Sequence, residues 1–132
     1  MYCTKQDMID RGWETELIQR TDRDNTGLMD DTVLTQAISD ASATIDGYIS
    51  AYLPLSSVPA VLVRHCCDIA RYGLYDDHQL DKDHAVRLRY DAAIRFLEQV
   101  AMGKIALVTI SGETLEPAAL IEMSSSPSVF GR

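Results

Sequence analysis

Apolar residues between positions 33 and 52 recur every three or four residues, which predicts one long amphipathic helix. Asp30 or Asp31 is expected to cap its start, because a carboxylate accepts hydrogen bonds from free amides and faces the positive end of the helix. Pro54 is expected to end it at Leu53, since the residue before a proline avoids helical geometry. The apolar stripe consists of Val33, Leu34, Ala37, Ile38, Ala41, Ile45, Tyr48, Ile49 and Tyr52.

Two further long helices are predicted after this one. Ser57, with Pro59 just inside, indicates a helix that runs to about Tyr75. Apolar residues cover most of its circumference, which is typical of a helix in the middle of a bundle or at a subunit interface. The next helix runs from about residue 82 to residue 102 and ends at Gly103. Its heptad seam is Val86, Tyr90, Ala93, Leu97 and Val100, while Leu88, Ile94 and Phe96 lie off the seam and suggest a second covered surface.

Both ends of the chain differ from this middle part. Thr4 and Asp7 form a capping-box pattern at the start of a short helix over 5–11, and a second short helix follows to about residue 20. A polar loop then covers 21–30. The chain is therefore predicted to be an all-α bundle of about five helices over residues 1–104, with a short β-like segment at 105–110 and an extended arm over 105–132.

The predicted arm has backbone groups that need a partner. A single strand is not stable alone, because its amides and carbonyls stay unpaired. We therefore expect the arm to add to a sheet or groove of another chain and to become ordered only in an assembly. Its candidate contact residues are Ile105, Leu107, Val108, Ile110, Val129 and Phe130.

The composition limits the classes of function. The formal charge of −8 disfavours general binding to nucleic acid, because an acidic surface repels phosphate. No apolar run approaches the ~20 residues of a membrane span, and the N-terminus lacks the apolar core of a secretion signal, so we expect a cytoplasmic protein. Three cysteines, two of them adjacent, do not suggest a disulfide framework.

Two segments resemble metal sites at first sight. Residues 22–30 match the opening of a calcium loop, but Val33 occupies the position of its bidentate glutamate, so a capped loop between helices is favoured. The run His65-Cys66-Cys67-Asp68 fans out around a helix and does not converge on one ion. Burial is expected to raise the pKa of Cys66 and Cys67, which argues against a cysteine nucleophile. No catalytic residue and no cofactor site is predicted.

Two regulatory functions remain as alternatives to a structural one. The 22–30 loop leaves open a calcium-binding protein, and the short N-terminal helices permit a helix-turn-helix DNA-binding topology. The turn regions are acidic, however, whereas a recognition helix needs basic residues that face phosphate.

Several segments, in order and spacing, carry a likeness to a known family. These segments are Met1-Tyr2-Cys3-Thr4, Asp7-Met8-Ile9, 17–23, 45–49, 52–55, Val58-Pro59, 67–72, 89–94 and Gly103-Lys104. On these segments, over residues 1 to about 104, the chain resembles the Mu-like phage and prophage family of small head-to-tail adaptor, or connector, proteins. It departs from the family pattern at Gly12-Trp13, where the family usually has Phe-Gly, and after Lys104.

The resemblance implies an all-helical, non-enzymatic virion protein of the phage neck. Such a protein forms a ring of about twelve subunits below the portal, extends the DNA channel and carries the next neck or tail-terminator protein. It is made in the host cytoplasm and has no catalytic residues.

Charged residues supply the remaining candidates for this role. Arg64, Asp68 and Arg71 form a charged strip at i, i+4 and i+7 that, with Arg87, Arg89 and Arg95, is expected to pair with neighbouring subunits. An acidic wall would let double-stranded DNA pass without sequence-specific binding. The candidate channel or rim acids are Asp22, Asp24, Asp30 and Asp31.

Overall fold

The computed structural model describes residues 1–75, 80–81, 84–107 and 114. These residues form an all-α fold and include no β-strand, in agreement with the predicted class. The predicted segment 105–107 is not a strand, and 108–110 lie outside the described residues. The elements are α1 (Lys5–Asp10), α2 (Glu14–Thr21), α3 (Asp31–Tyr48), the 3₁₀ helix η1 (Ser50–Tyr52), α4 (Ala60–Gly73) and α5 (Ala85–Ala101).

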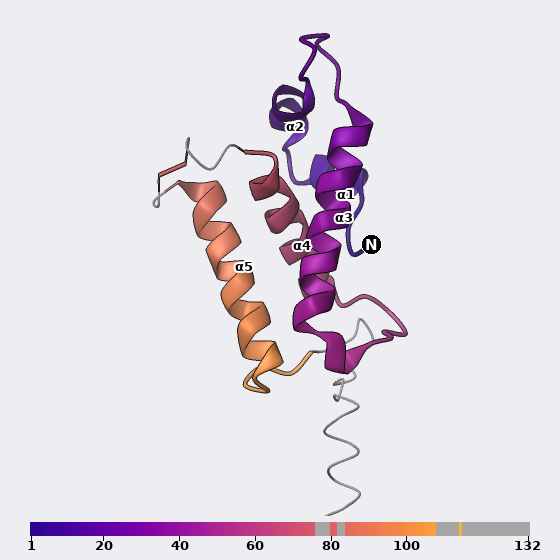
Figure 1. Cartoon of the computed structure of the whole chain (residues 1–132), viewed down its shortest axis with the longest axis vertical. Helices are drawn as coiled ribbons and strands as arrows, with labels where there is room; N and C mark the ends of the chain where they lie inside the picture. Colours follow the sequence, from indigo (N-terminus) through magenta and orange to yellow (C-terminus); the bar gives the residue numbers. More distant parts are fainter. Residues whose placement is uncertain (76–79, 82–83, 108–113, 115–132) are drawn as a thin grey trace, which may run out of the picture.

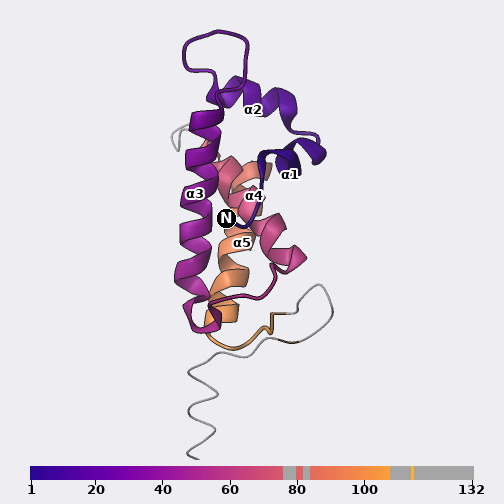
Figure 2. The same ribbon diagram turned by 90° about the vertical axis from the view of Figure 1, so that its right-hand side faces the viewer.

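The three long helices lie side by side, and α4 runs in the opposite direction to α3 and α5 (Figure 1). Helix α4 packs against α1, α3 and α5, which confirms the prediction from its nearly continuous apolar circumference. Figure 2 shows α1 and α2 near one end of α3, where they close that part of the bundle. The shared core includes Met8, Leu17, Leu34, Ile38, Ile45, Ile49, Leu62, Cys66, Ala93, Leu97, Val100 and Leu107.

The predicted caps at α1 and α3 are present. Thr4 Oγ1 accepts a hydrogen bond from the Asp7 amide at 3.1 Å, and Asp7 Oδ2 accepts one from the Thr4 amide at 2.9 Å. Asp30 caps α3, because its Oδ1 accepts from the amides of Thr32 and Val33. Each cap satisfies donors that the first turn of a helix leaves free.

The predicted end of α3 and the predicted starts of α4 and α5 differ from the structure. Leu53 is extended, as Pro54 requires, but α3 already ends at Tyr48 and the chain tightens into η1. Helix α4 begins after Pro59, which occupies the cap position without a side-chain bond, so Ser57 does not cap it. Helix α5 begins at Ala85, where His84 Nδ1 accepts from the Val86 amide at 3.2 Å.

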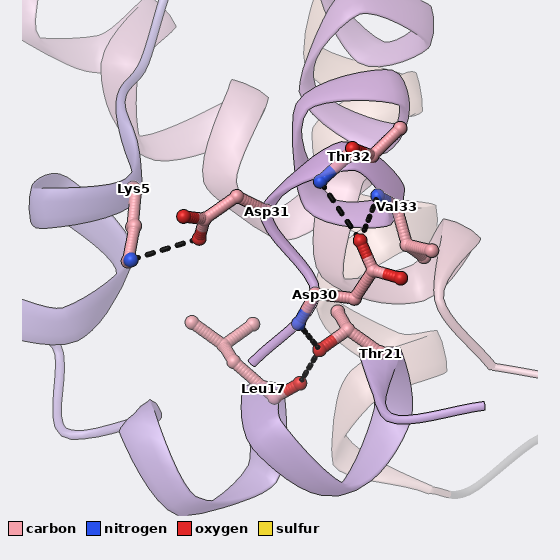
Figure 3. A network of polar contacts seen from close by, with 7 residues as sticks. All are labelled: Lys5, Leu17, Thr21, Asp30, Asp31, Thr32 and Val33. Atoms are coloured by element: carbon pink, nitrogen blue, oxygen red, sulfur yellow. Dashed lines mark hydrogen bonds and ion pairs between the residues drawn. The ribbon is translucent and has the colours of Figure 1, made fainter. Parts of the chain in front are cut away.

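A buried threonine joins the end of α2 to the start of α3 (Figure 3). The Thr21 hydroxyl donates to the Leu17 carbonyl at 2.7 Å and accepts from the Asp30 amide at 3.0 Å. The Thr21 side chain is fully buried, so water cannot reach its hydroxyl, and these two bonds satisfy the hydroxyl instead. Lys5 adds an exposed ion pair to Asp31 at 2.8 Å, which contributes little by comparison.

We predict that Thr21→Val destabilises the protein by about 1–3 kcal/mol, because it removes the buried hydroxyl that accepts from the Asp30 amide, which is then left without that acceptor. Urea denaturation followed by circular dichroism measures this change. Thr15→Val, at an exposed position of the same helix, is the control and should change the free energy of unfolding by less than about 0.5 kcal/mol. Equal effects of the two substitutions would contradict the role given to Thr21.

Candidate functional site

The loop between α2 and α3 uses its first aspartate to hold its own backbone. Asp22 Oδ1 accepts from the Thr26 amide at 2.7 Å and from Thr26 Oγ1 at 3.0 Å, and Asp22 Oδ2 accepts from the Gly27 amide at 2.6 Å. The amide bonds from Thr26 and Gly27 lower the pKa of Asp22. Asn25 and Gly27 have φ of 58° and 78°, which the tight loop requires.

The acids of the calcium-like pattern therefore do not converge on one point. Asp22 binds loop amides, Asp30 caps α3, Asp31 pairs with Lys5, and Asp24 is exposed. In the part of the chain that the structure describes, no group of three or more His, Cys, Asp or Glu side chains is placed to hold a metal ion. The acidic residues of this segment are therefore explained by the loop that joins α2 to α3 and by the cap of α3.

The four residues His65 to Asp68 do point to different neighbours, as their helical spacing predicts. The His65 ring lies 4.6 Å from the Phe96 ring, and Cys66 faces Cys3 and Ser42. Asp68 is 3% exposed, its Oδ1 lacks a hydrogen-bond partner, and the Arg89 Nη1 lies 3.7 Å away. Burial raises the pKa of Asp68, although the surrounding arginines act in the opposite direction.

A close group of thiols was missed by the sequence analysis. Cys3 Sγ lies 3.0 Å from Cys66 Sγ, in the buried core. The contact with Cys66 raises the pKa of Cys3, while the bonds from Cys3 lower the pKa of Cys66 and of Cys67. Burial does raise the pKa of Cys66 and of Cys67, as predicted, but the bonds from Cys3 outweigh it, so the predicted net rise is wrong. The missing information was the position of Cys3, which lies 63 residues away from Cys66 in the sequence.

The charged strip of α4 makes contacts within the chain. Arg71 Nη2 donates to Glu16 Oε1 at 2.7 Å, and its guanidinium lies 4.2 Å from the centre of the Trp13 ring. Burial alone would raise the pKa of Glu16, but the bonds from Arg71 and from Tyr75, whose hydroxyl lies at 2.5 Å, lower it. Arg64 is exposed. The strip therefore fixes α2 to α4, and only part of it faces solvent.

On α5 the arginines lie nearer the surface. Arg87 Nε lies 3.9 Å from Asp91 Oδ2 one turn further on, Arg89 is half exposed beside Asp68, and Arg95 is exposed. Of the predicted arm, Leu107 is fully buried in the core of this chain and Ile105 packs against the same core. The other four arm candidates, Val108, Ile110, Val129 and Phe130, lie outside the described residues.

Four large apolar side chains stand out on the surface of the described residues. Met1, Leu28, Leu88 and Met102 are 72%, 70%, 52% and 63% exposed. Leu88 lies off the heptad seam of α5, as the sequence indicated, whereas Leu28 was not recognised because it sits in the polar loop. Exposed apolar side chains of this size are typical of contacts with other proteins when they lie together. No helix in the described part of the chain is long and apolar enough to cross a membrane.

The described residues form a small helical bundle, and the comparisons with known proteins give the class to which the chain belongs. The chain belongs to the family described as "Bacteriophage Mu, Gp36", which matches residues 2–124. It is 39% identical to "Mu-like prophage FluMu protein gp36" of Haemophilus influenzae, over 100% of this chain and 94% of that protein. It is 36% identical to "Gene product J" of Escherichia phage Mu, over 99% of this chain and 94% of that protein. It is therefore a Mu-like phage protein.

We predict that the buried histidine makes stability depend on pH. Burial, with a smaller effect of Arg64, lowers the pKa of His65 from 6.5 to about 4. The unfolded chain then binds a proton more readily than the folded one, so stability is complete above pH 6.5 and falls as the pH drops towards 4. The loss should be on the order of 2 kcal/mol.

Urea denaturation of wild type and His65→Leu at several pH values measures this contribution. His65→Leu should flatten the dependence between pH 6.5 and 4, while Thr15→Val, at an exposed position of α2 and without a titrating group, should leave it in place. Curves of wild type and His65→Leu that remain parallel over this range would exclude His65 as the source.

Proposed function

We propose that this chain is a structural protein of the phage neck that forms a ring adaptor between the portal and the next neck or tail-terminator protein. The observation that carries the proposal is membership of the Mu Gp36 family over almost the whole chain, together with the resemblance to connector proteins. The ring would extend the DNA channel. The chain would assemble in the host cytoplasm and remain in the neck of the mature particle.

The surface of the protein supports repeated contacts with copies of itself. Leu88 and Met102 place exposed apolar area on α5, outside the core that the chain builds for itself. A contact between two different surfaces of identical subunits closes into a ring when the rotation between neighbours divides a full turn evenly and has no shift along the axis. Each contact can be modest, because a ring of about twelve subunits repeats it at every joint.

The charge distribution suits a channel that DNA passes through. Asp24 and Asp31 are exposed, and Asp22 and Asp30 are half-buried in the same loop region. Acidic side chains of this kind repel phosphate, so DNA would slide past without sequence-specific binding. We propose no catalytic activity and no cofactor for this role.

The C-terminal arm is proposed to hold the neighbouring chain or the portal. Because Leu107 belongs to the core, the part available to a partner begins after it. Extended segments bind by adding backbone hydrogen bonds to an exposed strand or by filling a groove. This would fix the adaptor to its partner after the helical part has folded.

The test is binding to the portal ring of the same phage. We predict that the purified chain forms a ring on the portal, visible by negative-stain electron microscopy, and that a chain ending at Leu107 binds at least about tenfold more weakly while keeping its melting temperature. Val129→Ser with Phe130→Ser is a milder second variant that should weaken binding in the same direction.

Two other outcomes would contradict the proposal. A melting temperature that rises on addition of calcium without any portal binding would support the calcium-binding alternative. Tight binding to duplex DNA with a steep dependence on salt, again without portal binding, would support a DNA-binding regulator.

A further inference from the structure

The long helices differ in charge, and the difference divides the bundle into two kinds of surface. Helix α3 carries three aspartates and no basic residue, whereas α4 and α5 together carry five arginines and three acidic residues. In Figure 1, α3 and α5 appear on either side of α4, and the two also contact each other, so each has an outer side that faces away from the other. Two copies placed side by side would thus bring an acidic helix next to a basic one.

The outer side of α5 has a stripe without acidic residues, which we call the α5 stripe. It runs along positions i, i+4, i+7 and i+11 and consists of Leu88, Ala92, Arg95 and Gln99. The first three of these side chains are exposed. The stripe lies away from the buried line Val86, Ala93, Leu97 and Val100, so it has no role in the core of this chain.

The outer side of α3 has a matching row at the same spacing, which we call the α3 row. It consists of Gln36, Asp40, Ala43 and Gly47, all exposed. Ala43 is small, and a Cβ added at Gly47 would meet nothing within 4 Å, so a second helix can approach closely here. Beside the row lies a shallow groove of about 320 Å³, lined on its apolar side by Val33, Ala37 and Leu74.

We propose that the α5 stripe of one copy docks on the α3 row of the next copy, with Leu88 in the groove and Arg95 against Asp40. The proposal rests on the ring function above and names its subunit contact. Helices α3 and α5 run in the same direction, and a rotation about an axis along the bundle keeps that direction in the next copy (Figure 1). The contact joins two different surfaces, so it propagates from copy to copy.

The spacing along the two helices fits this pairing. At about 1.5 Å per residue, Arg95 lies about 10 Å beyond Leu88. With Leu88 placed beside Ala37, Asp40 lies about 5 Å further along α3, so Arg95 and Asp40 are offset by only about 6 Å along the helix axes. An arginine side chain reaches across such distances and binds carboxylates through several donors.

The experiment exchanges the charges of the two surfaces. Arg95→Glu makes the α5 stripe acidic, and Asp40→Lys makes the α3 row basic; both positions are exposed, and circular dichroism checks that each variant folds. Each variant alone should need at least about tenfold more protein than wild type to form rings, alone or on the portal, because like charges meet at every joint. Assembly is measured by mass photometry and negative-stain electron microscopy.

The equimolar mixture of the two variants is the decisive measurement. Every joint in an alternating ring is complementary, because the acidic stripe meets the basic row and the unchanged stripe meets the unchanged row. The mixture should therefore assemble within about threefold of the wild-type concentration. Glu14→Lys, at an exposed position on α2, is the matched control and should assemble as wild type does.

The outcomes separate the two proposals. If wild type forms rings and the single variants also do so at the same concentration, or the mixture gains nothing over them, the contact proposed here is wrong while the ring function stands. Duplex DNA binding that Arg95→Glu abolishes, with assembly unchanged, would likewise overturn it. If wild type forms no ring even on the portal, the ring function itself fails.

Discussion

The packing of α4 between its neighbours is the constraint on which the rest of the structure depends. Leu62, Cys66 and Ala70 are buried on this helix, and so is Asp68, a residue that rarely tolerates burial. Nearly every direction around α4 is covered by α1, α3 or α5. The helix therefore fixes the relative positions of the other elements, and it leaves the outer sides of α3 and α5 exposed to solvent.

Polar interactions fix the orientation of the short helices relative to this apolar core. Arg71 binds Glu16 and packs on Trp13, which holds α2 to α4, and Thr21 joins α2 to α3. These contacts are specific in geometry, whereas apolar burial alone permits several arrangements of short helices. The loop that carries Leu28 is held in the same way by the Asp22 carboxylate, so its exposed leucine has a defined position.

Much of the fold could be predicted because it is encoded locally. The repeat of apolar residues from Val33 to Ile49 and the Thr4–Asp7 capping box depend only on neighbours within a few turns, and both are confirmed. The end of α3 could not be predicted from Pro54 alone, since a proline restricts only the residue before it. The proximity of Cys3 to Cys66, the pairing of Arg71 with Glu16 and the burial of Leu107 depend on contacts between distant segments, which no local pattern encodes.

We propose that this Mu Gp36 family protein forms a ring in the phage neck. A cryo-electron microscopy reconstruction of the neck of its own phage particle tests this directly. We expect a ring of this helical fold directly below the portal, around the DNA channel. Density for the chain elsewhere in the particle, or a neck in which no part fits the α3–α4–α5 bundle, would contradict it.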